Sequence, residues 1–101
     1  MKLGIPREVL DGEKRVAVVP SMIALLKKSK HEVFVETGAG VQASFADREY
    51  QDAGATICKD WRELYQACNV VLKFQPPRLH PQAGVHEAEL LTEGAALISF
   101  M

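Results

Sequence analysis

The chain has 101 residues, of which 48% are hydrophobic and 25% are charged, and its formal net charge is −1. This composition is typical of one small globular domain and excludes a disordered or fibrous protein. It offers no basic surface for nucleic acid, no polybasic stretch for an anionic membrane, and no apolar run near the roughly 20 residues of a membrane span.

Short apolar runs alternate with helical patterns from the start of the chain. We predict strands at Lys2–Ile5 and Glu32–Glu36, with a helix at Ser21–Lys28 between them. A loop with a charged centre, Pro6–Val19, follows the first strand. Its apolar end, Val16–Val19, is expected to anchor the loop on the domain.

The second half of the chain continues this alternation. Asp47 is expected to be the N-cap of the next helix, and Gly54 the residue that ends it. A later helix carries an apolar stripe at i, i+3, i+4 and i+7. The predicted elements are helix Asp47–Ala53, strand Thr56–Cys58, helix Asp60–Cys68, strand Val70–Phe74, helix His86–Leu91 and strand Ala95–Phe100.

An alternation of strands and helices predicts right-handed βαβ units around a parallel sheet. The expected fold class is therefore α/β, a Rossmann-like or flavodoxin-like open sheet of about five strands with helices on both faces. The last apolar run, ALISFM, has no helix after it to cover it. The sheet is therefore expected to be incomplete at its C-terminal end.

The cysteines and histidines match no metal-binding pattern. Cys58 and Cys68 form no CxxC pair and are expected to be reduced packing residues of a cytosolic-type compartment. His80 and His86 flank a loop that contains proline and glycine, so we expect both to be solvated. No metal site is predicted.

The segment Gly38–Ala43 matches the pattern G-x-G-x-x-A directly after a strand, and Asp60 lies 20 residues beyond Gly40. This resembles a dinucleotide-binding fingerprint. That motif, however, rests the pyrophosphate on a helix that begins within the glycine turn, and its ribose-binding acid ends the second strand. Here the next helix is expected only at Asp47, and Asp60 opens a helix. A tight structural loop with glycines at positive φ is the favoured interpretation.

Two basic residues are expected at the carboxyl edge of the sheet, where open parallel sheets bind ligands. Lys73 lies near the end of the fourth strand, and Arg15 lies in the loop after the first strand. Together they could hold a small 2-oxo acid. The alternative, which spacing alone favours, is that Lys73 extends to solvent at the sheet edge and Arg15 pairs with Glu8 or Glu13.

Four blocks of sequence, LGIPREVLDGEKRVAVVP, HEVFVETGAG, SFADREYQDAGATI and VVLKFQPP, resemble the N-terminal part of the alanine dehydrogenase/pyridine nucleotide transhydrogenase family. The resemblance covers nearly all 101 residues. It implies that residues 1–101 are the N-terminal part of the family's first domain. The NAD-binding domain, with its own glycine fingerprint, is then not present in this chain.

The blocks QASFAD and LISFM are more similar to the alpha subunit of the proton-translocating NAD(P) transhydrogenase than to alanine dehydrogenase. This resemblance implies hydride transfer from NADH to NADP⁺, coupled to proton translocation in a full complex with bound NAD(H) and NADP(H). It also implies a homodimer that meets an NADP-binding membrane subunit at the cytoplasmic side of a membrane. The chain alone is expected to be inactive, with no catalytic or cofactor-binding residue and no membrane insertion of its own.

Two alternatives remain. In alanine dehydrogenase, which deaminates alanine to pyruvate with NAD, the arginine and lysine of two family blocks bind the substrate. In this sequence the resemblance makes Arg15 and Lys73 the corresponding residues, whereas the catalytic histidine would follow Met101. The last alternative is a non-enzymatic, truncated module that binds a partner through its unfinished sheet.

Overall fold

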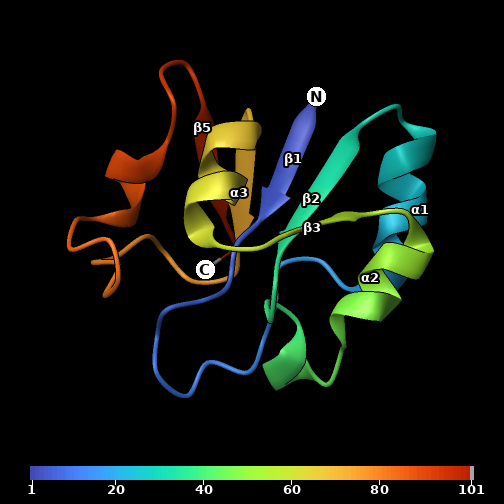
Figure 1. The fold of residues 1–101 in the computed structure, drawn as a ribbon, viewed down its shortest axis with the longest axis horizontal. Helices are drawn as coiled ribbons and strands as arrows, with labels where there is room; N and C mark the ends of the chain where they lie inside the picture. The colour runs from blue at the N-terminus through green and yellow to red at the C-terminus, as the bar shows by residue number, and fades with distance from the viewer. Residues whose placement is uncertain (101) are drawn as a thin grey trace.

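The computed structural model describes residues 1–100 and contains one five-stranded parallel sheet (Figure 1). The strand order is β3-β2-β1-β4-β5, so the order reverses between β1 and β4. All neighbouring strands pair in parallel. The strands are β1 (Lys2–Ile5), β2 (Glu32–Glu36), β3 (Thr56–Cys58), β4 (Val70–Lys73) and β5 (Ala96–Ser99).

Three α-helices connect the strands and lie on both faces of the sheet (Figure 1). They are α1 (Pro20–Lys28), α2 (Asp47–Ala53) and α3 (Trp61–Ala67). Two short 3₁₀ helices, η1 (Val41–Ala43) and η2 (Glu87–Leu90), lie in the connections that follow β2 and β4. The predicted fold class is confirmed, and the five predicted strands and the first three predicted helices lie within two residues of their expected bounds.

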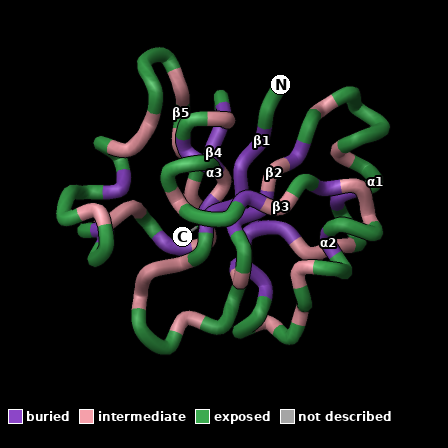
Figure 2. The backbone as a smooth tube through the Cα atoms, in the orientation of Figure 1, coloured by how far each residue is buried: buried purple, intermediate pink, exposed green. Residues whose placement is uncertain are grey.

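Each face of the sheet has its own hydrophobic cluster, as the alternation of side chains along a strand requires. In β2, Val33 and Val35 pack with Ile23 of α1 and Tyr50 of α2. Phe34, between the two valines, packs instead in the cluster built around α3. Figure 2 shows the buried residues running along the central strands, with exposed residues on loops and on the outer sides of the helices. Helices α1 and α2 therefore cover one face, and α3 covers the other.

The helix ends follow local signals, with one correction. Pro20 occupies the first turn of α1, where its missing N–H costs nothing. Asp60 caps α3 by accepting the Glu63 N–H at 3.0 Å. The N-cap of α2 is Ala46 rather than Asp47 as predicted. Asp47 instead faces back and accepts the Gly38 N–H at 2.9 Å, so it fixes the loop before the helix.

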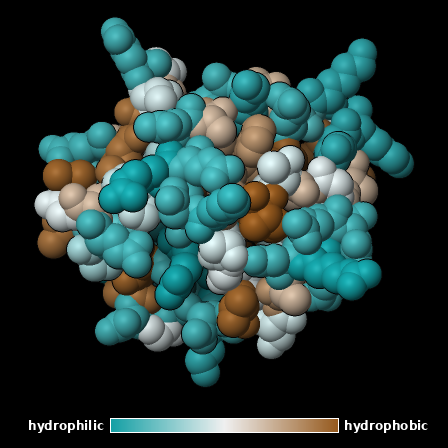
Figure 3. Space-filling model, viewed as in Figure 1, coloured by the Kyte–Doolittle hydropathy of each residue, from teal (hydrophilic) through white to brown (hydrophobic). Residues whose placement is uncertain are grey.

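Two features distinguish the C-terminal part of the chain from the rest of the domain. The predicted helix at residues 86–91 is only the 3₁₀ helix η2. Strand β5 lies at the edge of the sheet, with Ile98 47% exposed and, just after it, Phe100 53% exposed. On the face that Figure 3 shows, hydrophobic side chains form small separate groups among hydrophilic ones.

Both cysteines are free and buried, as the sequence predicts. Burial raises the pKa of Cys58 to about 11 and that of Cys68 to about 12, so both thiols are neutral packing groups. Among residues 1–100, no helix combines the length and apolar character that crossing a bilayer requires.

Candidate functional site

A cavity of about 490 Å³ lies at the carboxyl edge of the sheet. Its walls come from the loops after β1, β2 and β4; in Figure 1 the loops after β1 and β2 lie below the sheet. This is where open α/β sheets bind ligands, next to the reversal of strand order between β1 and β4. The lining includes Arg7, Glu8, Asp11, Glu13, Arg15, Glu36, Ala39, Val41, His80 and Pro81.

Lys73, the last residue of β4, is completely buried. Its Nζ atom lies 2.9 Å from Oε1 of Glu8 and 3.1 Å from Oε2 of Glu87. The prediction that Lys73 extends to solvent is therefore wrong. The ammonium group stays inside because two buried carboxylates replace the water that it loses.

The two carboxylates also hold the chain that surrounds Lys73. Glu8 accepts the backbone N–H groups of Phe74 at 2.9 Å and Gln75 at 3.2 Å. Glu87 accepts the N–H of Arg78 at 2.9 Å. One buried cluster of charges thus ties the loop after β1 to the end of β4 and to the segment before η2.

Arg15 is engaged by a carboxylate of its own. Its Nε and Nη2 atoms donate to the two oxygens of Glu13 at 2.8 and 3.0 Å, and its guanidinium lies 4.1 Å from the centre of the Phe74 ring. These hydrogen bonds, with one from Gln75, lower the pKa of Glu13 to about 2. The predicted pairing of Arg15 with Glu8 or Glu13 is confirmed for Glu13, and Val16 anchors the loop by burial.

Arg15 and Lys73 lie at the same edge of the sheet but do not form a common open clamp. Arg15 is exposed and lines the cavity, whereas Lys73 is buried behind Glu8. Each cation already has a carboxylate partner within 3 Å. A 2-oxo acid would have to displace Glu13 and Glu8 before it could reach both.

The sequence interpretation missed Glu36, the last residue of β2. Its side chain is 93% buried in the wall of the cavity, since only 7% is exposed. Oε1 accepts the Arg7 N–H at 3.0 Å. Burial raises the pKa of this carboxyl group above its ordinary value. An acidic residue that ends the second strand is a signal in the sequence that could have revealed it.

His80 is the second missed residue, and the prediction that it is solvated is wrong. It lines the cavity, is 4% exposed and lies with its ring centre 5.1 Å from that of Trp61. Its Nδ1 atom accepts the Ala83 N–H at 3.2 Å, so the neutral ring carries its proton on Nε2. Burial lowers the pKa of His80. His86 is exposed, as predicted.

The glycine loop after β2 is a structural turn. Gly38 has a φ of +81°, as expected, but Gly40 has a φ of −96°. Gly40 is required by space instead, because a Cβ there would lie 2.6 Å from the ring of Tyr50. The following α-helix begins at Asp47, and the loop follows β2 rather than β1, where a dinucleotide fingerprint belongs.

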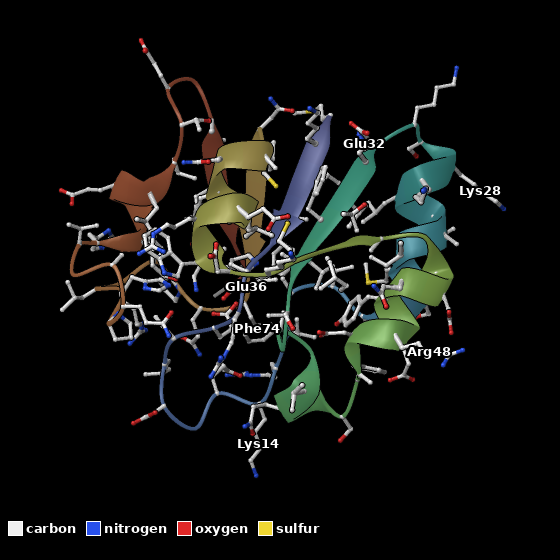
Figure 4. The ribbon with its side chains drawn as sticks, viewed as in Figure 1. Lys14, Lys28, Glu32, Glu36, Arg48 and Phe74 are labelled. Carbon is white, nitrogen blue, oxygen red and sulfur yellow. The ribbon has the colours of Figure 1, made fainter. Side chains whose placement is uncertain are left out.

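Among residues 1–100, no group of three or more histidine, cysteine or acidic side chains is placed to hold a metal ion. The charged groups that face the cavity are candidates for hydrogen bonding and charge recognition. Figure 4 shows Glu36 and Phe74 near the middle of the molecule, whereas Lys14, Lys28 and Arg48 extend outward.

Residues 4–101 match the family described as "Alanine dehydrogenase/PNT, N-terminal domain". The chain is 40% identical to the NAD(P) transhydrogenase subunit alpha of Cereibacter sphaeroides over 99% of its own length and 18% of that protein. It is 45% identical to the alanine dehydrogenase of Geobacillus stearothermophilus over 76% of its length and 21% of that protein.

Solved structures agree with these sequence matches. The fold superposes on the transhydrogenase from Sinorhizobium meliloti with a TM-score of 0.85 and 30% identity, covering 100% of this chain and 28% of that one. It superposes on an L-alanine dehydrogenase with a TM-score of 0.83 and 31% identity, covering 98% and 26%. The chain thus spans 18% to 28% of the length of these relatives. These matches show that the chain belongs to the alanine dehydrogenase/PNT family of oxidoreductases, in which it corresponds to the N-terminal domain.

Proposed function

We propose that these residues are the N-terminal segment of an NAD(P) transhydrogenase alpha subunit. The observation that carries the proposal is the internal pairing of both cations that a 2-oxo acid would need. Arg15 is held by Glu13 through two side-chain hydrogen bonds, and Lys73 is buried between Glu8 and Glu87. An enzyme that passes hydride between nucleotides has no such substrate, so these residues then serve the structure of the domain.

The proposal places the chemistry outside these residues. NAD(H) would bind to a second domain of the same subunit, and NADP(H) to a partner subunit. The segment would contribute one wall of the cleft between the domains, at the carboxyl edge where the cavity opens. A homodimer, a membrane subunit as partner, and a position on the cytoplasmic side of that membrane belong to the same proposal. They are supported by the similarity to transhydrogenase alpha subunits.

Alanine dehydrogenase is the second candidate, because Arg15 and Lys73 do lie at the same edge of the sheet. In that case pyruvate would exchange for the Glu13 carboxylate on Arg15. The complete polypeptide would then oxidise NADH with pyruvate and ammonium. Replacing Arg15 with Gln would lower that rate about 10- to 100-fold, since a charged hydrogen-bond pair is worth about 1.5–3 kcal/mol.

The deciding experiment uses the complete polypeptide with its NADP-binding partner. We expect hydride transfer from NADH to an NADP⁺ analogue, followed by absorbance, and no pyruvate-dependent oxidation of NADH. The Arg15→Gln variant should transfer hydride at the wild-type rate. Arg48→Gln, on the exposed side of α2, is the matched control for loss of one surface arginine. Pyruvate-dependent oxidation of NADH that Arg15→Gln removes would refute the transhydrogenase assignment.

A further inference from the structure

Glu36 occupies a special position in this sheet. It is the last residue of β2, which lies next to β1 in the order β3-β2-β1-β4-β5. In nucleotide-binding sheets of this order, the acid at the end of the second strand accepts the hydroxyl groups of a ribose. The topology therefore puts a carboxylate where a vicinal diol is bound in other α/β proteins.

The carboxylate is also fixed and open to the cavity. The Arg7 N–H donates to Oε1 of Glu36 at 3.0 Å. The Glu36 side chain is only 7% exposed, and it lines the cavity. In the described part of the chain, no hydrogen bond to Oε2 is found and Glu36 has no ion-pair partner within 4 Å, although the charge of Arg7, which also lines the cavity, attracts this carboxylate. A buried carboxylate with one oxygen free of hydrogen bonds is stabilised by a ligand that donates two hydroxyl groups to it.

The surroundings favour a ribose over a phosphate. The loop after β1 begins with Pro6, and α1 starts only at Pro20, so there is no glycine turn leading into a helix N-terminus. Arg15 is already paired with Glu13. His80 and Pro81 also line the cavity, whose volume of about 490 Å³ has room for a nucleoside.

We propose that this cavity binds the vicinal hydroxyl groups of a ribose, with the Glu36 carboxylate accepting hydrogen bonds from both. The ribose belongs either to a free nucleoside or to a dinucleotide whose phosphates lie on another domain. The proposal goes beyond the proposed function, which assigns no ligand to residues 1–101.

The test is a titration of the ¹⁵N-labelled 101-residue protein with adenosine and with 2′-deoxyadenosine, followed by the backbone amide signals of Arg7 and Ala39. We expect adenosine to bind about tenfold more tightly, because the deoxy compound lacks one of the two hydroxyl donors. In Glu36→Gln the two compounds should bind equally. Gln keeps a carbonyl oxygen for the Arg7 N–H, so the loop remains held. Asp11→Asn, at the same cavity, is the matched control and should keep the tenfold difference.

A parallel titration with NADH identifies the source of the ribose. Binding of adenosine that depends on Glu36 identifies a free nucleoside as sufficient, and binding of NADH alone that depends on Glu36 identifies a dinucleotide. Equal affinities of the wild-type protein for adenosine and 2′-deoxyadenosine, without Glu36-dependent binding of NADH, would overturn the proposal. So would a discrimination that survives in Glu36→Gln. Neither result depends on hydride transfer, so the proposed function would stand or fall separately.

Discussion

Removal of the Lys73 ammonium group is the sharpest test of how this edge of the sheet is held. The Lys73→Met substitution keeps most of the buried side-chain volume and removes the charge. It leaves Glu8 and Glu87 buried without the cation that lies 2.9 and 3.1 Å from their oxygens. We therefore expect the two carboxylates, rather than the missing lysine, to determine the loss of stability.

The expected magnitude follows from what remains around each carboxylate. Breaking a buried ion pair by removing one partner costs about 3–5 kcal/mol, because a buried charge is left uncompensated. Glu8 keeps two backbone N–H donors and Glu87 keeps one, which limits the loss. We expect the free energy of unfolding to fall by about 3–5 kcal/mol, a large part of the roughly 5–15 kcal/mol available to a domain.

Urea unfolding followed by circular dichroism measures this loss. With a slope of about 1–3 kcal/mol per molar urea, the midpoint should fall by about 1–5 M. Glu87→Gln leaves Lys73 paired with Glu8 and should cost less, about 1.5–3 kcal/mol. Lys28→Met, on the exposed end of α1, is the control and should change stability by about 0.5 kcal/mol or less. A Lys73→Met protein as stable as this control would refute the reasoning.

Three further predictions follow from single residues. Burial raises the pKa of Glu36 from 4.5, so the folded state binds the proton more tightly and the stability from this group is lost as pH rises above 4.5. Glu36→Gln should therefore lose less stability than the wild type between pH 4.5 and neutrality, and equal urea midpoint profiles would contradict this. Burial lowers the pKa of His80 from 6.5, so its contribution is lost as pH falls below 6.5. His80→Asn, which can still accept the Ala83 N–H, should lack this loss of stability below pH 6.5 when the urea midpoint is measured against pH. Gly40→Ala should destabilise the domain by about 1–3 kcal/mol in thermal or urea unfolding, since its Cβ would lie 2.6 Å from Tyr50; an unchanged midpoint would show that the loop can shift freely.

The elements of the fold were predictable because their signals are local. An apolar strand such as β4, a proline in the first turn of α1 and an aspartate before α3 each act within a few residues of chain. The start of the next helix, which argued against a nucleotide site at the glycine loop, is also a local signal. The ordered sequence blocks also identified the family, because they extend along the whole chain.

The candidate site was predictable only in outline. The sequence placed Lys73 and Arg15 at one edge of a parallel sheet and paired Arg15 with a nearby glutamate, since Glu13 is two residues away. It did not show that Lys73 is buried, because its partners Glu8 and Glu87 are 65 and 14 positions distant in the chain. It also did not show that the His80 ring packs at a tilt against Trp61.

The sequence by itself thus determined the order of the elements, the parallel sheet and the family, since periodicity and end signals are properties of short segments. Only the tertiary structure decided which charges are buried, which carboxylate compensates each cation, and which groups face the cavity. The physical reason is that the state of a charged side chain depends on the solvent and partners that surround it. Those surroundings come from three loops that meet only once the sheet has formed.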